Sequence, residues 1–142
     1  MIVLDTNVVS ELMKKSAAPQ VVRWVTSHPD SHLFTTSVTR AEVLRGIAEL
    51  PQGKRRDLLA AAAEATFDSD FSERILPFGS DAAKCYASIV AERRRIGRPV
   101  SVFDAQIAAI VRAHGASLAM RNIDVFAGCG LDVVNPWQPP TP

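Results

Sequence analysis

The order of apolar and polar stretches along the chain predicts an α/β fold, in which a mostly parallel central sheet is flanked by helices. The chain opens with a short apolar run, residues 2–4, that does not alternate with polar residues, as is typical of strands buried on both faces. Further short runs of this kind alternate with stretches of helical spacing, which favours parallel strands joined by helices. With 142 residues, 47% of them hydrophobic, the chain is expected to form a single domain over 1–142.

Five short segments have the apolar or β-branched character of buried strands. The first ends at the turn-forming Asp5-Thr6-Asn7. The expected strands cover residues 2–4, 33–36, 75–78, 117–120 and 132–134.

Helical spacing of apolar residues, together with start and stop signals, predicts six helices. Pro29 ends one of them, and Pro51-Gln52-Gly53 separates the two arms of a helical hairpin. Ser80-Asp81 is expected to cap the next helix, which stops where basic residues precede Gly97. Ser101 caps the last one. The expected helices cover residues 8–13, 20–27, 37–50, 58–67, 80–96 and 102–113.

Charge and cysteine content exclude several classes of protein. The chain has 16 Lys and Arg against 15 Asp and Glu, a net charge of +1, whereas proteins that coat phosphate backbones carry a large positive excess. Cys85 and Cys129 lie far apart and lack metal-ligand spacing, which excludes a disulfide scaffold. No basic leader or apolar run of ~20 residues is present, so we expect a cytoplasmic protein without a membrane anchor. The proline-rich residues 136–142 are expected to form an extended tail.

Two acidic residues in the first third of the chain have both a structural and a catalytic interpretation. Asp5 follows the first strand, where open α/β sheets build ligand crevices, but Asp is also among the best residues to cap a helix. Glu42 matches a capping box with Thr39. The apolar spacing, however, indicates that this helix begins nearer Ser37, which would place Glu42 in its second turn. Both interpretations stay open.

Two further acidic residues lie in the last third of the chain. Asp104 is one of only two polar residues in the stretch 102–111, so this helix is expected to be buried nearly all round. A buried carboxylate needs a cap, an ion pair, a proton or a cation, and Ser101-Val102-Phe103-Asp104 also matches a capping box. Asp124 follows the strand that contains Leu118, and it either joins the same edge of the sheet or forms a turn.

The four acids Asp5, Glu42, Asp104 and Asp124 each follow a strand or begin a helix, so a parallel sheet would bring them together at one edge. Clustered like charges need a cation, and oxygen ligands without His or Cys select Mg²⁺ or Mn²⁺. Such a site suits phosphodiester hydrolysis by a metal-activated water. A phosphatase with Asp5 as nucleophile is less well supported, because Asn7 stands where such enzymes carry a second Asp.

Basic residues cluster at 54–56 and 93–98, and Arg121 lies beside the expected acidic edge. Such runs are commonly solvated helix faces, with RNA contact as the alternative. Arg121 is the best candidate for RNA binding because of its position.

A series of motifs runs through nearly the whole chain. In order they are Leu4-Asp5-Thr6-Asn7-Val8-Val9-Ser10-Glu11, then Thr39 with Glu42 and Gly46, then Pro99-Val100-Ser101 with Asp104-Ala105 and Ile107-Ala108, then Arg121-Asn122 with Asn135-Pro136-Trp137. Together they resemble PIN-domain ribonucleases, and most closely the VapC toxins of bacterial type II toxin–antitoxin pairs.

The resemblance implies a three-layer α/β/α fold and a Mg²⁺- or Mn²⁺-dependent endoribonuclease. It implies that Asp5 and Asp104 bind the ion and that Glu42 binds it or orients the attacking water. It also implies a homodimer, inhibition by a cognate antitoxin whose tail occupies the active-site groove, and operator DNA binding through that antitoxin.

The fourth acidic position departs from the family pattern. Toxins of this type usually read Thr-Arg-Asn and carry Asp directly before Phe. Here Met120 replaces the Thr and Val125 precedes Phe126, so that Asp124 comes one place early. Asp124 therefore remains a catalytic candidate. Because of this altered loop, we expect the chain to have reduced rather than absent activity. The alternative is an inactive PIN fold that binds an antitoxin and serves repressor assembly.

Overall fold

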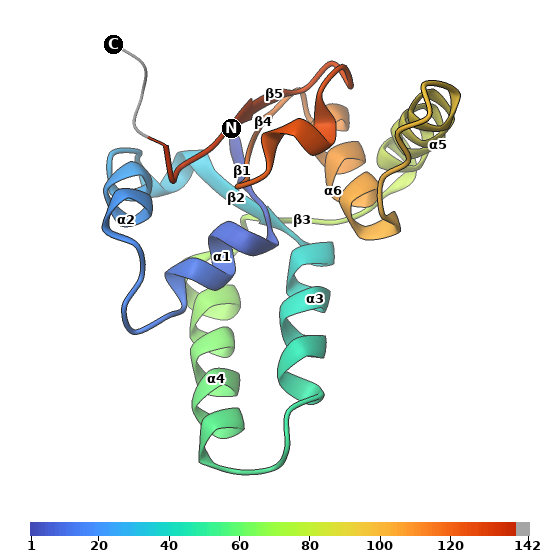
Figure 1. The fold of residues 1–142 in the computed structure, drawn as a ribbon. Helices are drawn as coiled ribbons and strands as arrows, with labels where there is room; N and C mark the ends of the chain where they lie inside the picture. Colours follow the sequence, from blue (N-terminus) through green and yellow to red (C-terminus); the bar gives the residue numbers. More distant parts are fainter. Residues whose placement is uncertain (139–142) are drawn as a thin grey trace.

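The central element of the computed structural model, which describes residues 1–138, is a sheet of five parallel strands in the order β3-β2-β1-β4-β5. Helices cover both of its faces (Figure 1). The expected α/β class and its three α/β/α layers are therefore confirmed.

All five expected strands are present. The third ends before Pro77, whose missing N–H prevents it from extending the ladder. The strands are β1 (Ile2–Leu4), β2 (Leu33–Thr36), β3 (Ile75–Leu76), β4 (Ser117–Ala119) and β5 (Asp132–Val134).

All six expected helices are present, with shifts at some of their ends. They are α1 (Thr6–Leu12), α2 (Pro19–Thr26), α3 (Ser37–Ala48), α4 (Lys54–Glu64), α5 (Ser80–Arg95) and α6 (Val102–Ala113). Three short helical turns accompany them: η1 (Asp30–His32), η2 (Ala65–Asp70) and η3 (Ile123–Phe126). Within residues 1–138, no helix combines the length and the apolar character that a membrane crossing requires.

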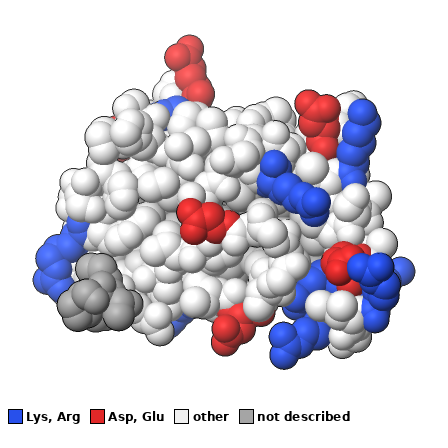
Figure 2. Space-filling model, turned by 90° about the horizontal axis from the view of Figure 1, so that it is seen from above, with Lys and Arg blue, Asp and Glu red and all other residues white. Residues whose placement is uncertain are grey.

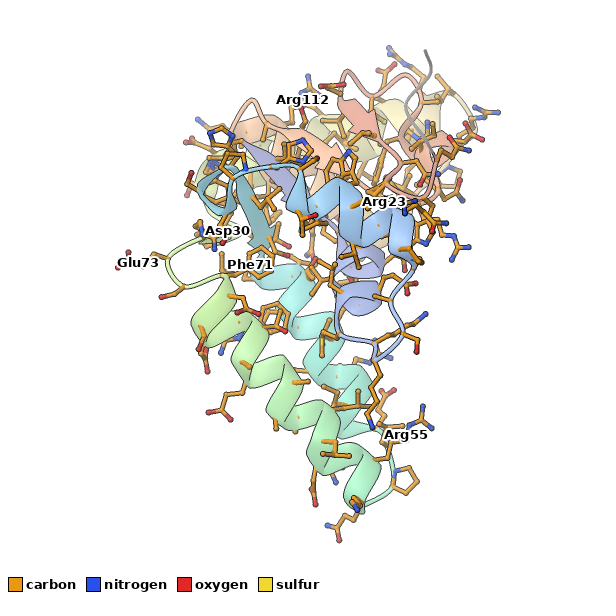
Figure 3. All side chains as sticks on the ribbon, turned by 90° about the vertical axis from the view of Figure 1, so that its left-hand side faces the viewer. Arg23, Asp30, Arg55, Phe71, Glu73 and Arg112 are labelled. Atoms are coloured by element: carbon orange, nitrogen blue, oxygen red, sulfur yellow. The ribbon has the colours of Figure 1, made fainter. Side chains whose placement is uncertain are left out.

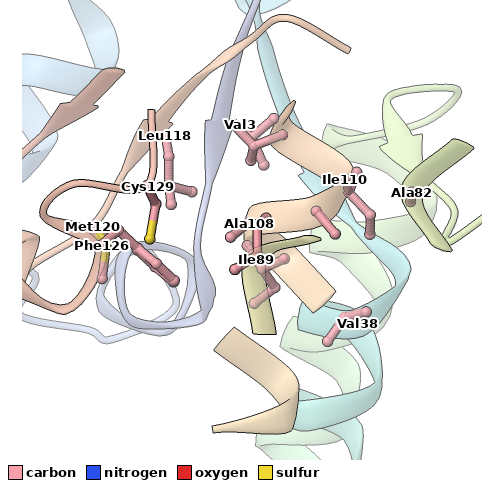
Figure 4. Packing of buried hydrophobic residues seen from close by; sticks show 13 residues of the cluster. Val3, Val38, Ala82, Ile89, Ala108, Ile110, Leu118, Met120, Phe126 and Cys129 are labelled. Carbon is pink, nitrogen blue, oxygen red and sulfur yellow. The ribbon is translucent and has the colours of Figure 1, made fainter. Parts of the chain in front are cut away.

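Each face of the sheet has its own hydrophobic core. On one face α5 and α6 pack against the strands, with the first turn of α3 at the edge (Figure 4). On the other face lie α1, α2, α4 and the rest of α3. Helices α3 and α4 form a hairpin that projects away from the sheet (Figure 1). Fully or nearly fully buried members include Val3, Ile89, Ile110 and Leu118 in the first core and Leu4, Val8, Val21 and Phe67 in the second.

The first turn of α6 differs from the expectation that this helix is buried nearly all round. Val102 and Phe103 are 58% and 38% exposed. Ala105 is the first buried residue of the helix, and the first core includes the helix from Ile107 onward. The helix thus enters the protein from its surface, and Asp104 stands at the point of entry.

The basic run that ends α5 is not a uniformly solvated face. Arg93 is only 4% exposed, and its Nη1 donates a hydrogen bond to the carbonyl oxygen of Ala127 at 2.8 Å. Its neighbours Arg94 and Arg95 are exposed. Arg93 therefore ties the end of α5 to the loop after η3, a role that a run of like charges does not reveal.

The end of the chain is not an extended tail over its described part. Residues 136–138 form a turn, in which the amide of Gln138 donates to the carbonyl of Asn135 at 3.1 Å. Trp137 packs against the second core. The remaining residues of the expected tail, 139–142, lie outside the described part of the chain.

Caps explain where the helices begin, and they yield a first prediction. The hydroxyl of Ser101 accepts a hydrogen bond from the amide of Asp104 at 3.1 Å, as expected. The cap of α5, however, is Gly79 and not Ser80-Asp81. We expect Ser101→Ala to lower the free energy of unfolding by about 1 kcal/mol. Ser80→Ala, measured in the same urea titrations, should change it by less than about 0.5 kcal/mol; equal losses in the two variants would contradict these cap assignments.

Candidate active site

The carboxyl ends of β1, β2 and β4 lie level at one edge of the sheet. Leu4 is in register with Ala119 of β4, and Val3 with Phe34 of β2. The amide of Asp5, the first residue beyond β1, donates to the carbonyl of Ala119 at 3.0 Å and so continues the ladder. The residues that follow these strands, including Asp5, are therefore held at a common edge.

Asp5 is at once a helix cap and a buried acid. Its Oδ1 accepts a hydrogen bond from the amide of Val8 at 3.0 Å, which caps α1, and the residue is only 7% exposed. The pKa of Asp5 is raised from 3.8 to about 7, chiefly by burial and also by the nearby charges of Asp104 and Glu42, and this value includes the lowering effect of backbone hydrogen bonds. The cap and the site interpretations are thus compatible, since the same carboxylate fills both positions.

Glu42 is not part of a capping box. The residue that caps α3 is Thr36, whose hydroxyl accepts a hydrogen bond from the amide of Thr39 at 3.0 Å. The helix therefore begins at Ser37, as the apolar spacing indicated, and Glu42 lies in its second turn. There its Oε1 accepts a hydrogen bond from the hydroxyl of Thr6 at 2.7 Å.

Thr6 and Thr39 belong to the site although the sequence did not identify them. Their hydroxyl oxygens lie 3.2 Å apart. Because Thr6 has one hydroxyl proton and Glu42 is the charged and closer acceptor, Thr39 is left to donate to Thr6. In the sequence, Thr6 stands next to Asp5 and Thr39 three residues before Glu42, and both belong to the motifs of the family resemblance, but none of these signals assigned a role to either hydroxyl.

Asp104 approaches the same edge from the first turn of α6. Its backbone amide is held by Ser101, its side chain is half-buried, and its charge acts on Asp5. Helix α3 packs against both α1 and α6. Asp5, Glu42 and Asp104, from three different helices, thus lie near enough to one another for the charges of Glu42 and Asp104 to act on Asp5.

Asp124 stands apart from these three acids. It is exposed on η3, where its backbone carbonyl accepts a hydrogen bond from the amide of Ala127 at 3.2 Å. This geometry agrees with the turn interpretation, and the acids whose charges act on Asp5 are Asp104 and Glu42. The catalytic role of Asp124 stays a prediction.

A groove runs from the acidic edge along the helical hairpin. It has a volume of about 340 Å³, and Thr6 and Glu42 lie at the end nearest the acids. Arg55 lines it toward the tip of the hairpin (Figure 3). Its walls come from α1, α3 and α4 and include the apolar side chains Met13, Val43, Ile47 and Leu59.

Basic side chains gather elsewhere as well. Seen from above, Lys and Arg are concentrated on the side of the molecule where α5 lies, and much of the rest of that face is uncharged (Figure 2). Acidic side chains lie among the basic ones on that side, so this face carries charges of both signs and no general coat of positive charge (Figure 2).

The donor set of the acidic edge fits a hard divalent cation. Carboxylate and hydroxyl oxygens are the ligands that Mg²⁺ and Mn²⁺ prefer, and the burial of Asp5 beside two other acids leaves a negative site that a cation would neutralise. Among residues 1–138, however, no three acidic, His or Cys side chains are already grouped closely enough to form a metal site. Side chains at this edge would therefore have to turn toward a bound ion.

Comparisons with known proteins agree with this architecture. The model of the PIN domain family matches residues 2–128. The chain is 38% identical over 139 residues to "VapC ribonuclease Y4jK" of Sinorhizobium fredii, with 98% of this chain and 99% of that protein covered. It is 34% identical over 138 residues to "Toxin FitB" of Neisseria gonorrhoeae, with 97% and 99% covered. The solved structure described as FitAB bound to an IR36 DNA fragment superimposes with a TM-score of 0.91 at 33% identity, covering 99% of both chains.

Proposed function

The chain belongs to the PIN domain family, among its VapC-type toxins, and we propose that it hydrolyses RNA phosphodiester bonds with a divalent cation, Mg²⁺ or Mn²⁺, as the toxin of a toxin–antitoxin pair. The observation on which the proposal rests is that Asp104 and Glu42 lie near enough to the buried Asp5 for their charges to act on it. The family relationship supports it, since the relatives include a protein named as a ribonuclease and one named as a toxin.

Asp5 and Asp104 would hold the cation, because they face the edge from β1 and from α6. When bound, a divalent cation lowers the pKa of a water molecule and neutralises negative charge on the phosphate that is attacked. The cap on Asp5 matters for this role: the amide of Val8 fixes Oδ1 and hence the orientation of the carboxylate.

Glu42 would orient the attacking water or contribute to cation binding. The Thr6 hydroxyl fixes its Oε1 at 2.7 Å, and Thr39 supports Thr6 in turn. This chain of hydroxyl groups restricts the rotamer of Glu42, and a pre-oriented carboxylate loses less freedom when it takes up water or a proton in the reaction.

The partners that the family relationship suggests also fit the surface. The apolar groove along α1, α3 and α4 opens at the acidic edge and carries Lys14 and Arg55 on its walls. An antitoxin segment with apolar and acidic side chains would match it, and its end would block the acids. We propose a homodimer as the form of the free toxin, and operator DNA binding only through the antitoxin; the structure described as FitAB bound to an IR36 DNA fragment supports DNA binding by a related complex.

Titration of Mg²⁺ and Mn²⁺ into the antitoxin-free chain, followed by calorimetry, tests this proposal. We expect saturable binding that is at least tenfold weaker in Asp104→Asn, because that variant loses one charged ligand, together with cation-dependent cleavage of labelled RNA. Asp68→Asn is the matched control, since Asp68 is exposed and pairs with Arg40 on the surface. If the chain binds an antitoxin tightly but neither binds a cation nor cleaves RNA, the proposed nuclease activity is contradicted. That result would support the alternative, an inactive PIN fold that binds an antitoxin.

A further inference from the structure

The loops that follow β4 and β5 are tied together by one side chain. Strands β4 and β5 end in register at Ala119 and Val134. Immediately beyond them, the Nδ2 of Asn135 donates a hydrogen bond to the carbonyl of Arg121 at 2.9 Å. The Oδ1 of the same amide accepts a hydrogen bond from the amide of Trp137, also at 2.9 Å. Asn135 therefore fixes Arg121 and Trp137 relative to each other.

The side chains of Arg121 and Trp137 are stacked. The guanidinium carbon of Arg121 lies 5.0 Å from the centroid of the Trp137 ring, within the range of a cation–π interaction. The ring itself is half-buried and packs against the second core. An exposed arginine, which would otherwise sample many rotamers, thus rests on a surface that the core holds in place.

A contact between the guanidinium carbon and a ring does not use the N–H groups of the guanidinium as hydrogen-bond donors. These groups form a planar fork that matches two oxygens of a phosphate. In the part of the chain that the structure describes, Arg121 makes no ion pair with a carboxylate within 4.0 Å. The residue is oriented but its charge is not neutralised by a close partner, which suits an anion supplied from outside.

Arg121 also stands beside the acidic edge. It comes two residues after Ala119, whose carbonyl holds the amide of Asp5 at 3.0 Å. The charge of Arg121 helps to lower the pKa of Glu11 on α1, mainly lowered by the hydrogen bond from Lys14 at 3.2 Å. A phosphate bound by Arg121 would therefore lie at the carboxyl edge of the sheet, the edge at which Asp5 stands.

We infer that Trp137 and Asn135 are positioning residues, which hold the guanidinium of Arg121 so that it binds a backbone phosphate of the RNA next to the phosphate that is cleaved. This inference rests on the proposed nuclease function. The alternative is that the stack only fastens the end of the chain to the core, with no effect on RNA.

A double-mutant cycle separates the two possibilities. The full chain would be titrated in EDTA, which prevents cleavage, against a fluorescently labelled single-stranded RNA of mixed sequence. Arg121→Gln should weaken binding about fivefold to tenfold and lower the slope of log Kd against log salt by about 0.7, the contribution of one phosphate contact on a single strand. Trp137→Leu should weaken binding about threefold to fivefold in the parent, but should add nothing in the Arg121→Gln background.

Two further variants show whether the stack acts through position. Trp137→Phe retains an aromatic face and should recover most of the affinity. Arg121→Lys keeps the charge but loses the planar fork. This variant should bind RNA about threefold more weakly than the parent. In its background, the further change Trp137→Leu should leave RNA binding unchanged. Because Arg121 is exposed, this variant folds even if Trp137→Leu does not. In steady-state cleavage with Mg²⁺, KM should rise while kcat changes little, as expected for a contact made equally in ground and transition states.

Arg112→Gln is the matched control, because it removes one exposed positive charge from the end of the molecule opposite the hairpin tip (Figure 3). Equal loss of RNA affinity on Trp137→Leu with and without Arg121, or unchanged affinity in Arg121→Gln, would overturn the inference. Failure of the parent chain to bind or cleave any RNA would instead overturn the proposed function itself.

Discussion

Asp5→Asn is expected to lower the rate of RNA cleavage by about a thousandfold or more while leaving the fold intact. Asn removes the negative charge that a cation needs, and loss of cation-assisted charge stabilisation amounts to several kcal/mol of activation free energy, with about 1.4 kcal/mol for each factor of ten. The fold should survive because Asn caps helices as well as Asp does. Its amide oxygen can keep the hydrogen bond from Val8 that begins α1.

The measurement is the single-turnover rate of cleavage of a labelled RNA at saturating Mg²⁺, with Asp68→Asn as the control for removal of an exposed acid. Circular dichroism of both variants checks that the helices are retained. Cleavage by Asp5→Asn within tenfold of the parent rate would show that the reaction does not use this edge of the sheet.

The strands and helices were predictable because their signals are local. The run 2–4 is followed by Asp5, which caps α1, and the hydroxyl of Ser101 caps α6. Local signals fail where two patterns overlap. Thr39 and Glu42 match a capping box, yet the residue that caps α3 is Thr36, three residues earlier, whose hydroxyl accepts a hydrogen bond from the amide of Thr39. The capping-box motif alone would begin the helix too late, and the apolar spacing from Ser37 gives the observed start.

The closeness of Asp5, Glu42 and Asp104 was predictable, because the carboxyl ends of parallel strands share one edge. The hydroxyl groups of the site were not, since Thr6 and Thr39 are 33 residues apart in the chain. The same holds for Arg93, whose partner carbonyl is 34 residues away. Contacts between distant segments depend on the register of the whole sheet, and no short motif encodes that register.

The metal-free chain is expected to lose stability as the pH rises from about 4 to about 8. The pKa of Asp5 is about 7 in the folded chain against an ordinary 3.8, chiefly because of burial. Between these values the folded chain keeps a proton that the unfolded chain has released. The stabilising contribution of this proton is therefore complete below pH 3.8 and is lost as the pH passes through 7; by linkage it amounts to at most about 4 kcal/mol.

Urea unfolding in EDTA at pH 5 and pH 8, for the parent and for Asp5→Asn, isolates this contribution. Other acids titrate in both proteins and cancel in the difference, so Asp5→Asn should gain on the parent by about 2 kcal/mol or more between the two pH values. Divalent cation at pH 8 should raise the stability of the parent alone, because it binds only the folded chain and needs the charged carboxylate. Identical pH dependence of the stability in the two proteins would mean that burial does not raise the pKa of Asp5. The expected result would instead show that the charge of the Asp5 carboxylate destabilises the folded chain when no cation is bound. Cation binding nevertheless requires this charge. Such a compromise between stability and function is common at active sites.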